Sequence, residues 1–171
     1  MSNVNHIKDF TNKITETPGA IYGKFTKQML RDHEQSDFNQ YLKKNLKKLK
    51  DKNIIASEEE NQINEIIDII TSTKEFNKKA EELITLYNHI MDNKDSGKMV
   101  RIISCIAADS AHNKYQRPRD STGMESNQIE YVLGINISGA LVGAVIGSND
   151  CGIEGAIFGA LIGATASSVT R

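Results

Sequence analysis

Apolar residues recur every three to four positions through most of residues 1–115, and this spacing predicts consecutive amphipathic helices. No stretch sustains the two-residue alternation of a strand, so the pattern predicts an all-α fold. About five such helices can enclose one core. The apolar positions are Ile7, Phe10 and Ile14; Tyr22, Phe25, Met29 and Leu30; Phe38, Tyr41, Leu42, Leu46 and Leu49; Ile63, Ile66, Ile67 and Ile70; Phe76, Ala80, Leu83, Ile84, Tyr87 and Met91; and Val100, Ile103 and Ala107.

Capping and turn residues predict where several of these helices begin. Ser36 is expected to cap one helix, because its hydroxyl can accept a hydrogen bond from the first turn, and Thr73 is expected to begin another. Ser57 is followed three positions later by Glu60, which is the spacing of a capping box. Residues 95–97 are expected to form the turn before the last helix of this region.

A change in composition predicts a domain boundary. Residues 116–128 are polar and include one proline and one glycine, as linkers do. From residue 132 onward, the charged side chains are only Asp150, Glu154 and Arg171. We therefore expect three parts: a soluble helical domain over 1–115, a polar linker over 116–128 and a separate unit over 129–171.

Glycine spacing is the most specific feature of that last unit. Eight of the twelve glycines fall in the final 38 residues, and six of them keep a strict four-residue spacing within two similar segments, 138–147 and 154–163. Residues four apart share one face of a helix. A turn signal over 149–152 separates the segments, which predicts a helical hairpin with a glycine stripe on each helix. The six glycines are Gly139, Gly143, Gly147, Gly155, Gly159 and Gly163.

The glycine stripe predicts close helix packing. A glycine inside a helix costs roughly 1 kcal/mol relative to alanine, so the helices need compensation from another backbone. We expect the six glycines to supply the packing and oligomerisation surface, either within the hairpin or between copies. A flexible tail is disfavoured, because flexible segments combine glycine with serine rather than with Ile, Leu, Val and Phe.

The hairpin segments are apolar enough to suggest a membrane. The uncharged run over 131–149 exceeds the roughly 18 residues of a candidate span. The run over 155–170 is shorter and would cover about 24 Å of a ~30 Å hydrocarbon layer. We expect the hairpin to insert into or dock on a membrane. The alternative is a soluble cytosolic homo-oligomer, structural or for interaction with partners, in which the hairpin is the buried assembly seam.

The repeat resembles the glycine-zipper hairpins of bacterial envelope antigens, of some secreted membrane-active toxins and of channel proteins. The resemblance covers about 35 residues and includes no catalytic chemistry. It implies tight helix association, often in a membrane, and is compatible with a membrane-permeabilising effector or an anchored scaffold. The abundance of Asn, Lys and Ile also suggests a bacterial origin.

A lysine-rich stretch supplies a second candidate surface. The candidate lipid-facing residues on one predicted helix are Lys43, Lys44, Lys47 and Lys48. Such a helix can lie on anionic lipid, and the alternative is an ordinary solvated face. Nucleic acid is not an expected partner, because the net charge is −1 and no aromatic residues interleave the lysines.

Catalytic and metal-binding patterns are not found in the sequence. The four histidines are far apart, and neither an HExxH nor a CxxC spacing occurs. We therefore expect a protein that is not an enzyme, with no catalytic residues, metal or cofactor, and the sequence identifies no small-molecule substrate. The alternative is an enzyme whose site residues are too dispersed along the sequence to recognise. The first ten residues include no apolar core of a secretory signal, so cytoplasmic synthesis is expected.

Overall fold

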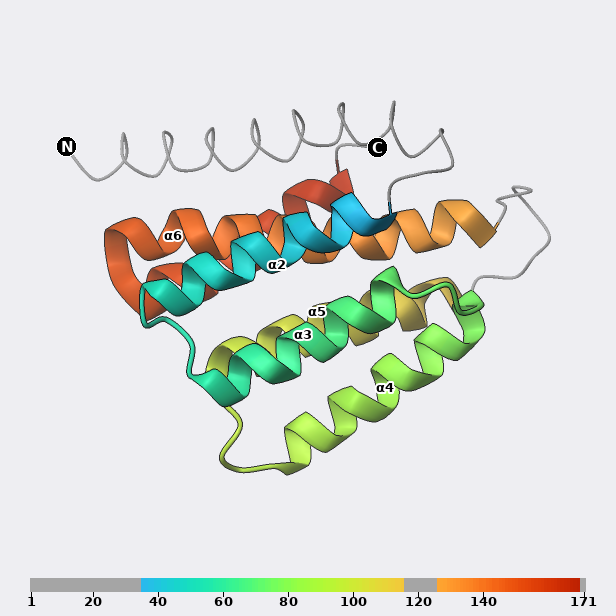
Figure 1. The fold of residues 1–171 in the computed structure, drawn as a ribbon, viewed down its shortest axis with the longest axis horizontal. Coiled ribbons are helices and arrows are strands. Elements are labelled where there is room, and N and C mark those ends of the chain that lie inside the picture. Colours follow the sequence, from blue (N-terminus) through green and yellow to red (C-terminus); the bar gives the residue numbers. More distant parts are fainter. Residues whose placement is uncertain (1–34, 116–125, 170–171) are drawn as a thin grey trace.

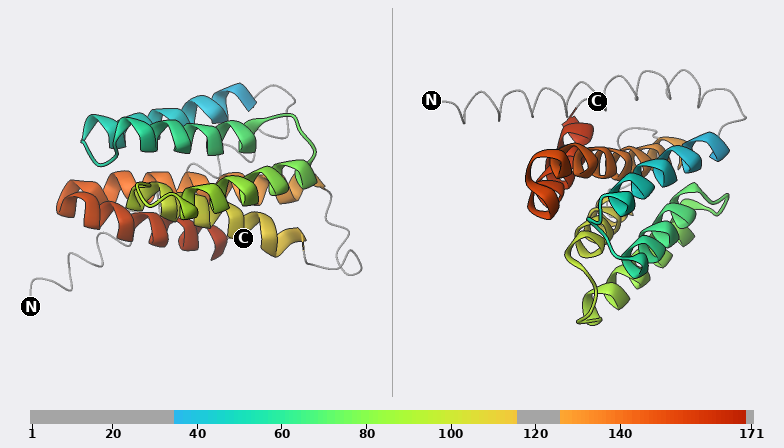
Figure 2. Two further views of the ribbon diagram at one scale, coloured as in Figure 1. Left: turned by 90° about the horizontal axis from the view of Figure 1, so that it is seen from below. Right: turned by 60° about the vertical axis from the view of Figure 1, so that its left-hand side comes forward.

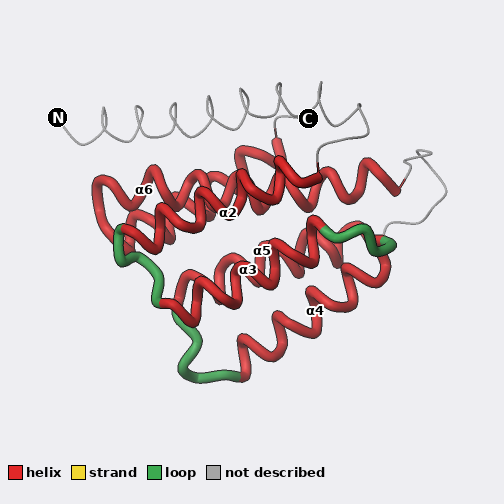
Figure 3. Tube along the Cα trace, in the orientation of Figure 1, coloured by secondary structure: helices red, strands yellow, loops and turns green. Residues whose placement is uncertain are grey.

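The computed structural model describes residues 35–115 and 126–169, and within them it is helical with no strand (Figure 1, Figure 3). The predicted all-α class is therefore confirmed. The helices expected around Ile7–Ile14 and Tyr22–Leu30 and most of the expected linker lie outside the described residues. The described helices are α2 (Gln35–Asp51), α3 (Ser57–Thr71), α4 (Phe76–Asp92), α5 (Lys98–Tyr115) and α6 (Ser126–Val169).

The helices before α6 form two packed pairs, which also meet through α3 and α5, and α6 then joins them. α2 packs on α3, and α4 packs on α5. α6 lies against α5 and α2, so that the last helix of the chain closes the arrangement (Figure 1, Figure 2). α6 therefore packs mainly on α5 and α2, and part of it stays at the surface.

One cluster of buried side chains connects all five described helices. Leu46 of α2, Ile67 of α3, Leu83 of α4 and Ile103 of α5 belong to it, and so does Ile137 of α6. Residues on both sides of 116–125 therefore share one core. The division of the chain at 116–128 stays a prediction from composition, and these contacts weigh against two separate units.

The start of α3 differs from the predicted capping box by one residue. The helix begins at Ser57 after the cap residue Ala56, and the Glu59 carboxylate accepts the Ala56 N–H at 3.0 Å. Glu59 rather than Glu60 has this role because it stands three positions after the actual cap. The Ser57 hydroxyl instead accepts a hydrogen bond from Lys50 Nζ at 2.7 Å.

The inward face of α4 also differs from the expectation. The helix begins at Phe76 rather than at Thr73, and Met91, which was expected to face inward, is exposed. Lys79 is buried instead, and its Nζ donates a hydrogen bond to the carbonyl oxygen of Ile70 at 3.2 Å. This carbonyl lies in the last turn of α3, where a positive charge is favourable and free carbonyls need donors.

Replacement of the buried lysine is expected to destabilise the fold. Lys79→Ala should lower the free energy of unfolding by about 2–4 kcal/mol, because it leaves a cavity and removes a donor at the end of α3. Lys78→Ala is the matched control, since Lys78 is exposed on the same helix. Urea unfolding followed by circular dichroism measures both variants, and equal stability of the two would contradict the role of Lys79.

Candidate functional site

A break in the backbone divides α6 into two arms. Cys151 and Gly152 leave the helical conformation, and Gly152 has φ 58° and ψ −134°. Residues 126–150 are called the first arm, and residues 153–169 the second arm. A Cβ on Gly152 would meet no atom within 4 Å, so glycine is favoured there by the positive φ rather than by lack of space. After the break the second arm returns along the first (Figure 2).

The six repeated glycines face each other across the two arms. A Cβ on Gly143 would overlap the carbonyl oxygen of Gly159, and a Cβ on Gly159 would overlap that of Gly143. Gly155 has the same relation to the Gly147 carbonyl, and Gly163 to the Gly139 carbonyl. The arms therefore run antiparallel with their backbones in contact.

This contact occurs within one chain. The glycine surfaces cover one another and leave no glycine stripe open to a second copy while the arms stay together. The role of these glycines in oligomerisation stays a prediction, and it requires either separation of the arms or another surface.

Alanines extend the close packing beyond the glycines. Ala144 of the first arm and Ala160 of the second arm are fully buried, as is Ala111 of α5. Small side chains on neighbouring helices let the backbones approach, and the added van der Waals and Cα–H···O contacts offset the low helix propensity of glycine.

The first arm lies inside the bundle. Its side chains from Leu133 to Ser148 are buried or half-buried. The Asn136 side-chain amide donates a buried hydrogen bond to the Ser110 hydroxyl of α5 at 2.9 Å. At the far end, Lys52 donates hydrogen bonds to Ser148 Oγ, at 3.2 Å, and to Asn149 Oδ1. Polar contacts to α5 and to the end of α2 thus position this apolar arm.

Tyr41 makes a further polar contact between α2 and the first arm. Burial raises the pKa of its hydroxyl above the usual value of 10.0, and side-chain hydrogen bonds with Asn45 and Ser138 act in the opposite direction. Because Ser138 is on the first arm, the half-buried phenol of Tyr41 helps to fix the position of that arm against α2.

The second arm presents three of its large apolar side chains to solvent, whereas Ile157 and Ile162 are half-buried. The glycines face the first arm, and the side chains of Ala156 and Ala160 are buried. In contrast, the exposed fraction is 58% for Phe158, 47% for Leu161 and 44% for Ile153. We call Ile153, Phe158 and Leu161 the outer face. The outer face was not predicted from the sequence. Its signal is the alternation of small and large residues in 154–163. When the helix face with the small residues packs against the first arm, the face with the large residues must point away from it.

Length and composition make this region compatible with a membrane. The stretch Leu133–Thr165 is long and apolar enough to cross a bilayer. A core helix of a soluble protein can have the same length and composition, and the first arm is largely buried. The two arms therefore differ: one is enclosed by the bundle, and the other offers an apolar surface.

The structure does not gather the four candidate lysines on one free surface. Lys43 forms an ion pair with Asp68 of α3 at 2.7 Å, and Lys47 pairs with Asp51 at 3.2 Å. Lys44, Lys47 and Lys48 are exposed. Their binding to lipid stays a prediction.

The described residues hold no group of three or more His, Cys, Asp or Glu side chains that could bind a metal ion. Comparisons with protein-family models, with curated proteins and with solved structures found no match to this chain. Evidence for the function therefore comes from the residues of this chain and their geometry.

The close approach of the two arms gives a direct prediction. Gly143→Ala should lower the free energy of unfolding by about 1–3 kcal/mol, because the new Cβ collides with a backbone carbonyl that no side-chain rotation can relieve. This loss should exceed the roughly 1 kcal/mol that alanine gains in helix propensity.

Gly134→Ala is the matched control, measured in the same thermal and urea unfolding experiments. A Cβ on Gly134 would approach the Phe38 ring at 3.0 Å, and a ring can shift slightly. We expect a change within about 1 kcal/mol for this variant. A Gly143→Ala protein as stable as the Gly134→Ala protein would contradict the observed packing.

Proposed function

We propose that this chain is a non-enzymatic, membrane-associating protein, and that the outer face of the second arm is its lipid contact. The observation that carries this proposal is the exposure of Phe158, Leu161 and Ile153 on a helix that has small residues on its inner side. Full burial of one such side chain contributes about 1.5–3 kcal/mol. Three side chains that are already half-covered can together supply several kcal/mol to interfacial docking.

Docking on the surface fits the geometry better than insertion of both arms. Insertion would remove the first arm from the core and break the Asn136–Ser110 hydrogen bond. It would also expose the apolar sides of α2 and α5 that now cover this arm. The docked protein keeps its bundle, and only the outer face enters the boundary between headgroups and acyl chains.

Electrostatics favour lipid without net charge. Glu154 is exposed on the same side of the second arm as Phe158, four residues before it, and Asp150 is exposed just before the arm; both carboxylates repel an anionic surface. Tyr41 of α2 and Lys52, which follows α2, make their polar contacts with the first arm, at Ser138 and Ser148. The proposed docking uses the outer face of the second arm rather than the lysines of α2. A membrane-docked effector or scaffold is the role that we infer from this arrangement.

A second candidate function follows from the burial of the first arm. An apolar helix enclosed by its own bundle is typical of a soluble protein, and the outer face can then pack against the same face of another copy. In that case the protein is a soluble homo-oligomer for structural or interaction purposes. The occupant of the outer face distinguishes the two functions.

Vesicle flotation tests the first proposal. Wild-type protein should float with phosphatidylcholine vesicles, and Phe158→Ser/Leu161→Ser should bind about tenfold or more weakly, because two apolar side chains no longer enter the lipid. Met91→Ser is the matched control, since Met91 is a 40% exposed apolar residue on α4, and its binding should be unchanged.

Light scattering on the same proteins identifies the alternative. Wild-type protein that does not float, but forms an oligomer that Phe158→Ser/Leu161→Ser dissociates, would support the homo-oligomer and contradict lipid docking. Equal flotation of the wild type and the double variant would exclude the outer face as the lipid contact.

A further inference from the structure

A groove lies at the surface of the molecule between α3 and α4. The helices splay apart from the loop that joins them (Figure 1), and the space between them has a volume of about 1020 Å³. Half-buried Ile69 of α3 and Leu86 of α4 both line it. Each of the two helices thus contributes one apolar side chain to the groove.

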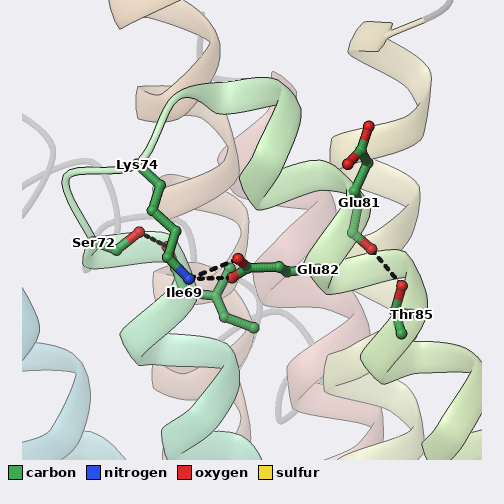
Figure 4. Close-up of polar contacts among 6 residues, drawn as sticks. All are labelled: Ile69, Ser72, Lys74, Glu81, Glu82 and Thr85. Atoms are coloured by element: carbon green, nitrogen blue, oxygen red, sulfur yellow. Dashed lines mark hydrogen bonds and ion pairs between the residues drawn. The ribbon is translucent and has the colours of Figure 1, made fainter.

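Carboxylates line both walls of this groove. Glu65 and Asp68 project from α3, and Glu81 and Glu82 from α4. Lys74 neutralises Glu82 through contacts of 2.6 and 2.7 Å (Figure 4).

Asp68 is neutralised as well, by Lys43. Glu65 and Glu81 form no ion pair with any residue in the part of the chain that the structure describes. The groove therefore keeps uncompensated negative charge on each of its walls.

A surface of opposite charge lies on α2 of the same molecule. Lys44, Lys47 and Lys48 are exposed at spacings of three and four residues, so they form a ridge on one side of the helix. The pair between Lys47 and Asp51 is solvent-exposed, and such pairs contribute little. Lys44 and Lys48 form no ion pair within residues 35–115 and 126–169. Each copy thus has a cationic ridge and an anionic groove.

We propose that the α3–α4 groove binds α2 of a second copy of this chain. The aliphatic stems of Lys44 and Lys48 would cover Ile69 and Leu86, while their ammonium groups reach Glu65 and Glu81. This arrangement uses the apolar residues and both unpaired carboxylates of the groove at once.

The contact is between copies rather than within one. α2 is held against α3 of its own chain by the buried side chains Leu42, Leu46 and Leu49, so its exposed lysines on the other side are available to a neighbour. Because ridge and groove are different patches, the contact is head-to-tail and can continue from copy to copy. The outer face of the second arm takes no part, so this inference is independent of the proposed lipid docking.

Charge reversal tests the proposal by sedimentation velocity over a concentration series. At low salt, wild-type protein should have a mean mass above the 19.0 kDa of one chain, and the mass should rise with concentration. It should return to one chain in about 0.5 M salt, where ionic screening is strong. Lys44→Glu/Lys48→Glu and Glu65→Lys/Glu81→Lys should each remain monomeric, with at least tenfold weaker association, because ridge and groove then have the same sign.

Mixing the two variants gives the decisive result. Each ridge then meets a groove of opposite charge on the other variant, so association should be restored in the mixture. Lys94→Glu/Lys98→Glu is the matched control, since it makes the same charge change at exposed positions outside both surfaces, and it should associate like the wild type.

Three results would overturn the proposal: a wild-type protein that is monomeric at every concentration, association that persists in the separate variants, or a mixture that stays monomeric. Association that is insensitive to salt and to these charges, but is lost in Phe158→Ser/Leu161→Ser, would instead assign self-association to the outer face.

Discussion

The contact between two glycine-lined backbones determines how the C-terminal quarter of this protein is arranged. Gly143 and Gly159 approach so closely that neither position has room for a Cβ. Once the small residues of each arm face the other arm, the large residues must point elsewhere. Those of the first arm, such as Leu133 and Ile137, enter the core, and Phe158 of the second arm remains at the surface.

The proposed lipid contact follows from this arrangement. The first arm is a structural helix, because α2 and α5 cover it and side-chain hydrogen bonds hold it in place. The second arm keeps one exposed apolar side, which can contact lipid or another apolar surface. The anionic groove and the cationic ridge involve α3, α4 and α2 only. Association through charge and association through apolar contact can therefore act separately on one molecule.

Much of the fold was predictable from periodicity, and the exceptions have physical causes. Ile63, Ile66, Ile67 and Ile70 all face the core as their spacing predicts. Lys79 does not follow the pattern, because its ammonium group pairs with the end of another helix, and that contact is invisible in local sequence. The site was predictable only in part, since the spacing of the glycines shows which residues share a face but not which side of an apolar helix is exposed. The groove depends on helices α3 and α4 splaying apart, which no motif encodes.

The most direct test of the account measures which chain supplies the partner of each glycine. In isotope-labelled protein at low concentration, nuclear Overhauser contacts between the α protons of Gly143 and Gly159 should appear. They should be missing from an isotope-filtered experiment on a mixture of labelled and unlabelled chains, because both glycines belong to one molecule. Contacts that appear only in the filtered experiment, or no contacts at all, would contradict the packing on which the outer face depends.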